Sequence, residues 1–185
     1  FVMLNLEQMK PMKSIVLFGL LCIAFVACKS PNNDNPRSER SQMKIASMKL
    51  ARDPHTWSKP NEARVKHLDW NANVHFDTHT IDAVAKYVIE NVSGTDTIFF
   101  DTKGLNITHV LVDGVGVSFV LGPEKEYIGS ALKVPIQKAS KEVSITYSTS
   151  PEAEALLWVD GEKPFLFSQS QAILARTWVP CQDSP

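Results

Sequence analysis

Residues 67–76 alternate strictly between polar and apolar side chains, and this pattern constrains the fold more than any other part of the sequence. The apolar positions are Leu68, Trp70, Ala72, Val74 and Phe76, and histidine, aspartate and asparagine occupy the positions between them. A period of two is the spacing at which side chains of a β-strand point to the same face of a sheet. The pattern therefore predicts a strand with one buried face and one face in water.

Further short strands are predicted downstream, separated by turns that contain Gly, Pro, Asn or Asp. After a turn at 77–80, we expect strands at 83–91, 97–100, 107–112, 117–121, 131–136 and 142–148. Asp113-Gly114 is a tight-turn signal, so the strands on either side of it are predicted to form a hairpin. Strands at this spacing predict an all-β fold, an antiparallel β-sandwich or a curved sheet.

Charge and cysteine content argue against a nucleic-acid-binding protein and against a disulfide-stabilised one. Lysine and arginine number 19 against 20 acidic residues in a chain of 185, so the net charge gives no reason to expect a nucleic-acid partner. Three cysteines are too few for a disulfide framework. The histidine and aspartate at positions 67 and 69 could share a cation on the polar strand face, but we favour a face that is simply solvated.

The N-terminal part has the features of an export signal. A basic start at Met12 is followed by a short apolar run and a small residue before Cys28, and the run is too short to span a bilayer comfortably. The ending Phe25-Val-Ala-Cys28 resembles a bacterial lipobox, with phenylalanine where leucine is usual. We expect residues 1–28 to be an upstream extension plus a lipoprotein-type signal peptide lipidated at Cys28. An ordinary signal peptide is the alternative.

Residues 29–52 are predicted to be a flexible, disordered tether, because residues 30–40 contain no large apolar side chain. The folded domain is then expected at 53–185. Such a protein would be exported and anchored through its lipid in the cell envelope of a bacterium, in the outer membrane or periplasm. Lys29 after the lipidated cysteine favours the outer membrane.

The C-terminal stretch from Phe165 carries the most specific pattern. Gln169 and Gln171 follow an aromatic run, and their spacing predicts that both side chains lie on one face of an extended strand. By spacing alone, a polar face on an edge strand would be the preferred interpretation. An arginine and a proline-bounded turn, 180–185, follow.

This stretch resembles the end of the N-terminal domain in zinc aminopeptidases of the leukotriene A(4) hydrolase and aminopeptidase N family. There, a Phe-Ser-Gln-x-Gln-Ala run lines the substrate cleft and a Pro-Cys-x-Asp-x-Pro turn follows it. Other segments also resemble this family: 53–58, 67–76, 101–107, 145–151 and 155–158. The resemblance implies a saddle-like antiparallel β-sandwich, incomplete at its C-terminus and truncated before the catalytic domain.

The resemblance also implies roles for individual residues. Gln169, Ser170 and Gln171 would bind the N-terminal end of a peptide substrate, whereas Arg176 and Asp183 would be structural. The motif His-Glu-x-x-His does not occur in the chain, so no catalytic residue or metal ligand is assigned here. The zinc ligands would lie in the missing catalytic domain of the same protein, which is therefore an expected partner together with peptides and the membrane.

A non-catalytic alternative remains open at this point. The strand pattern would equally suit a β-sandwich surface lipoprotein that binds a partner or a sugar, and a degraded pseudogene is a third possibility. Genomic sequence downstream of Pro185 separates these alternatives. Continuation into a zinc-binding helix favours the peptidase, a stop codon favours the binding module, and frameshifts favour the pseudogene.

Overall fold

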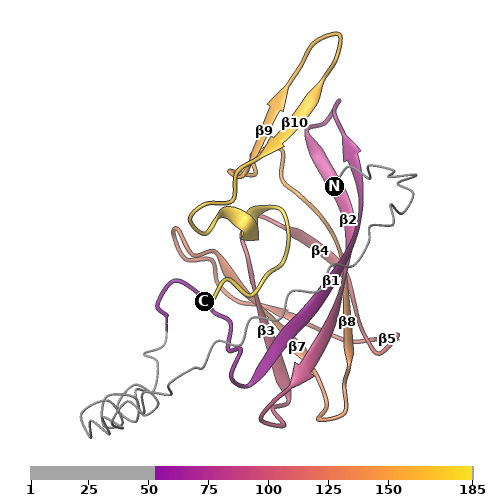
Figure 1. Cartoon of the computed structure of the whole chain (residues 1–185), viewed down its shortest axis with the longest axis vertical. Coiled ribbons are helices and arrows are strands. Elements are labelled where there is room, and N and C mark those ends of the chain that lie inside the picture. The colour runs from indigo at the N-terminus through magenta and orange to yellow at the C-terminus, as the bar shows by residue number, and fades with distance from the viewer. Residues whose placement is uncertain (1–52, 185) are drawn as a thin grey trace, which may run out of the picture. The chain divides into compact units, whose positions relative to one another are not determined.

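The computed structural model describes residues 53–184, which form two antiparallel sheets packed face to face and a separate β-hairpin (Figure 1). The predictions for the signal peptide, Cys28 and the tether lie outside the described residues. The strands are β1 (Ala63–His75), β2 (Thr80–Asn91), β3 (Thr97–Thr102), β4 (Asn106–Val112), β5 (Val115–Gly116), β6 (Val120–Leu121), β7 (Ser130–Pro135), β8 (Glu142–Ser148), β9 (Leu156–Val159) and β10 (Phe165–Ser168).

The larger sheet has the strand order β1-β2-β8-β4-β5, and the smaller one has the order β3-β7-β6. Every pairing between these strands is antiparallel. Among the described residues, β9 and β10 pair only with each other, as a two-stranded sheet. The predicted all-β, antiparallel sandwich is therefore confirmed for this part of the chain.

The core lies between the two large sheets and explains why the alternating strands form. On β2 and β8 every second residue is buried, and these side chains meet apolar residues from β3 and β7. Tyr87 and Phe100 are in ring contact across the sandwich, with centroids 4.8 Å apart. Burial of such side chains contributes roughly 1.5–3 kcal/mol each, which is why this alternation determines which face turns inward.

The apolar face of β1 is only half covered, in contrast to the sequence-based expectation. Leu68 and Trp70 pair with Tyr87 and Ala85 of β2 and so lie on the core side of the sheet, as predicted. Leu68, Trp70 and Val74 are nevertheless 37–38% exposed. β1 is the edge strand of the five-stranded sheet, so in the described region its side chains have a neighbouring strand on one side alone, that of β2.

The predicted strand 117–121 is wrong in its extent. The chain pairs with β4 over β5 and through one further bond, from the Val117 N–H to the Val110 carbonyl oxygen at 3.0 Å, and it then crosses to the other sheet, where β6 pairs with β7. Residues 117–119 form the crossing, with Val117 and Phe119 half-buried against the core. The hairpin at Asp113-Gly114 does form, and Asp113 adopts a φ of 49°, which aspartate tolerates better than most residues.

Helical structure in the described region consists of one 3-10 turn, η1 (Leu174–Thr177). Over residues 53–184 there is no helix with the length and apolar character needed to cross a membrane.

Candidate functional site

The candidate site begins where the β9–β10 hairpin ends. β10 stops at Ser168, so Gln169 and Gln171 lie just beyond the strand, and the prediction that they belong to it is wrong. The Gln169 N–H still donates to the Ala155 carbonyl oxygen at 2.8 Å, which continues the hairpin ladder by one bond. The Gln171 N–H donates to Gln169 Oε1 at 3.3 Å, so the segment turns on itself instead of continuing as an extended strand.

Gln169 and Gln171 are exposed, whereas Ser170 between them is half-buried. Ser170 Oγ accepts a hydrogen bond from the indole nitrogen of Trp178 at 2.9 Å, and its carbonyl oxygen accepts one from the Leu174 N–H at 2.9 Å. The middle residue of the predicted trio is thus an anchor for the segment, and the two amides on either side of it face solvent.

Trp178 is itself held by residues of β1 and β8 in the large sheet. Its ring meets Trp70 edge to face at 5.3 Å, and its carbonyl oxygen accepts a hydrogen bond from the Tyr147 hydroxyl at 2.9 Å. The Trp70 indole N–H donates to the same hydroxyl at 2.8 Å. Burial raises the pKa of Tyr147 above its usual range, so the hydroxyl stays protonated and keeps both bonds.

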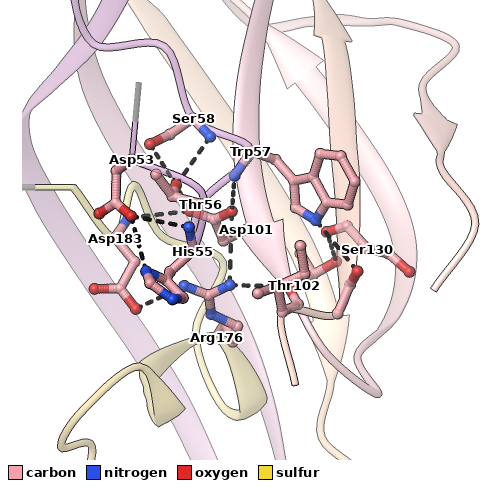
Figure 2. A network of polar contacts seen from close by, with 12 residues as sticks. Asp53, His55, Thr56, Trp57, Ser58, Asp101, Thr102, Ser130, Arg176 and Asp183 are labelled. Atoms are coloured by element: carbon pink, nitrogen blue, oxygen red, sulfur yellow. Dashed lines mark hydrogen bonds and ion pairs between the residues drawn. The ribbon is translucent and has the colours of Figure 1, made fainter. Parts of the chain in front are cut away.

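Arg176, which lies in η1, is fully buried and organises the turn that follows the candidate segment. Its Nη2 lies 2.9 Å from Asp183 Oδ2 (Figure 2), and its Nη1 donates to the Ile128 carbonyl oxygen at 2.8 Å. The structure thus brings Arg176 and Asp183, the two residues predicted to be structural, into one ion pair. A guanidinium suits this position because its planar fork can satisfy several acceptors at once.

Asp101, at the end of β3, is the second buried charge of this network. It accepts hydrogen bonds from Thr56 Oγ1 at 2.5 Å, the Trp57 N–H at 2.6 Å and the Asp183 N–H at 3.1 Å. Its Oδ1 also lies 3.9 Å from Arg176 Nη1. One carboxylate therefore joins the opening segment 53–58, strand β3 and the C-terminal turn, as Figure 2 shows.

Gln182 connects the same turn to the edge of the large sheet. Its side-chain oxygen accepts a hydrogen bond from the Val65 N–H at 2.8 Å, and its side-chain nitrogen donates to the Ala63 and Phe99 carbonyl oxygens at 3.0 and 3.1 Å. One amide therefore contacts both β1 and β3.

Metal binding finds no support among residues 53–184, where no group of three or more His, Cys, Asp or Glu side chains could hold an ion. The two histidines of the polar face of β1 instead lie near single aspartates, with His67 Nε2 3.3 Å from Asp69 Oδ1 and His75 Nε2 3.0 Å from Asp82 Oδ2. Burial raises the pKa of the Cys181 thiol well above its usual range, which argues against a thiolate nucleophile.

Sequence reasoning missed two features of the site. Asp101 begins the segment 101–107 that resembles the family, but its buried network does not show in the sequence, because a buried carboxylate cannot be recognised without knowing its donors. His79, in the β1–β2 turn, gave no pattern at all. Its φ of 54° and its contact with Trp158 are visible only in three dimensions.

Comparison with known proteins gives a consistent result. Residues 64–185 match the family described as Peptidase M1 N-terminal domain. Leucine aminopeptidase 2 of Candida albicans is 35% identical over 136 residues, which cover 72% of this chain and 22% of that protein. Leukotriene A-4 hydrolase of Xenopus laevis is 30% identical over 145 residues, covering 72% of this chain and 24% of the relative. The chain thus spans less than a quarter of the length of these curated relatives.

Solved structures agree with this match. Yeast LTA4 hydrolase in complex with bestatin superimposes with a TM-score of 0.69 at 28% identity, over 78% of this chain and 24% of that one. An M1 zinc metallopeptidase from Deinococcus radiodurans gives a TM-score of 0.54 at 17% identity, over 69% of this chain and 30% of that one. The second likeness concerns the fold alone.

Proposed function

The chain belongs to the peptidase M1 N-terminal domain family, and on that premise we propose that it forms one wall of the substrate cleft in an exported bacterial zinc aminopeptidase. The parent protein would remove N-terminal residues from peptides. The observation that carries the proposal is the Gln169–Gln171 segment, in which two exposed amides flank a serine fixed by Trp178.

The chemistry of these amides suits a peptide N-terminus. A side-chain carbonyl oxygen can accept a hydrogen bond from a substrate ammonium, and hydrogen bonds to charged groups contribute roughly 1.5–3 kcal/mol. Because a neutral amide supplies no charge, a carboxylate from the catalytic domain would complete recognition. In our proposal, Gln169 and Gln171 therefore orient the substrate and take no part in bond cleavage.

Zinc enters this proposal only through the parent protein. The family relatives include zinc metallopeptidases, yet residues 53–184 offer no set of metal ligands. The described domain does not fit the metal, so we assign the zinc ligands to the catalytic domain and derive no step through the ion here.

Substitution of Gln171 by alanine in the full-length enzyme tests the proposal. Loss of one charge-assisted hydrogen bond predicts a fall of about 10- to 100-fold in kcat/KM for aminoacyl substrates. Gln137→Ala, an exposed glutamine after β7, is the matched control and should leave kinetics unchanged. Unchanged hydrolysis by Gln171→Ala would contradict the role in the cleft.

Lipid anchoring at Cys28 is the second part of the proposal, and it rests on the sequence of the export signal. In a bacterial host, the chain should partition with membranes and gain the mass of a lipid modification. Cys28→Ser should release it, whereas Cys22→Ser, in the same apolar run, should not. Release by neither variant would remove the anchor from the proposal.

A further inference from the structure

The β9–β10 hairpin needs contacts from outside itself to stay in place. Within residues 53–184 its two strands pair only with each other, and an isolated two-stranded hairpin is at best marginally stable in water. Its outward face carries Leu157, Phe165 and Phe167, which are all more than half exposed. The hairpin extends beyond the sandwich beside the β1–β2 turn in Figure 1.

The β1–β2 turn supplies such contacts, because two of its aromatic side chains pack against Trp158 of the hairpin. Phe76 meets the Trp158 ring edge to face at 5.6 Å. The imidazole of His79 stacks on the same ring, with centroids 5.2 Å apart and an interplanar angle of 12°. His79 Nε2 also lies 3.0 Å from Asp160 Oδ1, at the far end of β9. One imidazole therefore contacts both a ring and a carboxylate of the hairpin.

The hairpin in turn leads directly into the candidate site. Leu156 pairs with Ser168 at its base, and the next bond joins the Gln169 N–H to the Ala155 carbonyl oxygen at 2.8 Å. We propose that His79 is a positioning residue that holds the hairpin through Trp158 and Asp160, and thereby fixes where Gln169 and Gln171 stand. This inference rests on the function proposed above, because that function assigns substrate binding to residues 169–171.

The backbone at His79 guides the choice of variant. Its φ of 54° lies in the left-handed region, which costs most residues energy but is more readily adopted by histidine and asparagine. His79→Asn therefore removes the stacked ring while tolerating the turn. His79→Arg can replace both contacts, since a guanidinium can stack on an indole and bind a carboxylate, but it adopts the left-handed φ less readily than histidine, so only part of the lost protection is expected to return.

Hydrogen exchange on the folded chain measures the proposed effect directly. In His79→Asn, the hydrogen-bonded amides of β9 and β10 and that of Gln169 should lose protection by roughly 3- to 70-fold, the sum expected for one aromatic stack and one surface pair. Amides of β2 and β8 in the same molecule serve as the internal standard and should stay unchanged. His75→Asn removes another exposed histidine–aspartate pair, also at 3.0 Å, and should not affect the hairpin.

Two further readouts separate positioning from general destabilisation. His79→Arg should restore at least half of the lost protection. His79→Asn should change tryptophan fluorescence, and the change should vanish in a Trp158→Phe background. Unchanged hairpin protection, equal loss in β2 and β8, or failure of arginine to rescue would overturn the inference. None of these measurements uses catalysis, so they remain distinct from the Gln171→Ala test of the proposed function.

Discussion

Replacement of Asp101 by asparagine probes the buried network without changing its volume. Both carboxylate oxygens are acceptors in the structure, Oδ1 for the Trp57 N–H and Oδ2 for Thr56 Oγ1 and the Asp183 N–H. An amide replaces one of these oxygens with an NH2 group. Thr56 can rotate its hydroxyl to compensate. In either orientation of the asparagine amide, however, the new NH2 group faces a backbone N–H, that of Trp57 or that of Asp183.

The magnitude follows from these contacts. A buried donor without a partner costs about 1–3 kcal/mol, and removal of the negative charge leaves Arg176, 3.9 Å away, with one carboxylate fewer. We therefore expect Asp101→Asn to lower the free energy of unfolding by about 3 kcal/mol. For roughly 130 described residues, this corresponds to a fall of about 10 °C in Tm.

Thermal and urea denaturation followed by circular dichroism measure this change. Asp113→Asn is the matched control, because Asp113 uses only its Oδ1 to accept the N–H groups of Lys141 and Glu142, each at 2.9 Å. Asparagine keeps that oxygen and tolerates the left-handed backbone there, so the control should stay within about 0.5 kcal/mol of the wild type. A loss below about 1 kcal/mol in Asp101→Asn, or an equal loss in the control, would refute the reasoning.

Three other changes test separate parts of the structure. Tyr147→Phe removes the hydroxyl that bridges two tryptophans and should cost about 1 kcal/mol, whereas Tyr127→Phe, an exposed residue, should cost nothing measurable. Gly129→Ala should cost about 3 kcal/mol or more, because the new methyl would overlap a neighbouring carbonyl oxygen; Gly114→Ala, also at positive φ but in open space, should cost only about 1–2. The pKa of Cys181 is raised in the folded state, so its stabilising contribution is complete below the unfolded pKa near 8.5 and is lost as pH rises. Urea titrations from pH 7.5 to 9.5 should show a decline of at most about 1.4 kcal/mol per pH unit, which Cys181→Ala abolishes.

The sandwich could be predicted because its strands carry their own pattern. Every second residue of β2 and β8 is buried, and alternation of this kind is visible in the sequence. Pairing between strands is a different matter, since the crossing at 117–119 depends on which sheet offers a free edge. The sequence shows only one apolar run there, so the break between β5 and β6 was missed.

For the candidate site, the sequence named residues whose role stays a prediction, and it did not predict the shape of the segment that carries them. Motif resemblance identified Gln169, Ser170 and Gln171, yet a spacing of two is equally compatible with a strand and with a turn. In the structure the segment turns, because the Gln171 N–H donates a hydrogen bond to Gln169 Oε1. Contacts made by side chains distant in sequence, such as His79 with Trp158, leave no periodic trace.

The amide of Gln182 has a consequence for how the large sheet could grow. It offers Val65 an acceptor and Ala63 a donor, as the peptide group of an adjacent strand would. The backbone hydrogen-bonding groups at this part of the β1 edge are therefore already satisfied by a side chain of the same domain. An additional strand that paired with β1 would therefore have to begin its pairing at residue 66 or later. Gln182 thus restricts the register in which such a strand could bind.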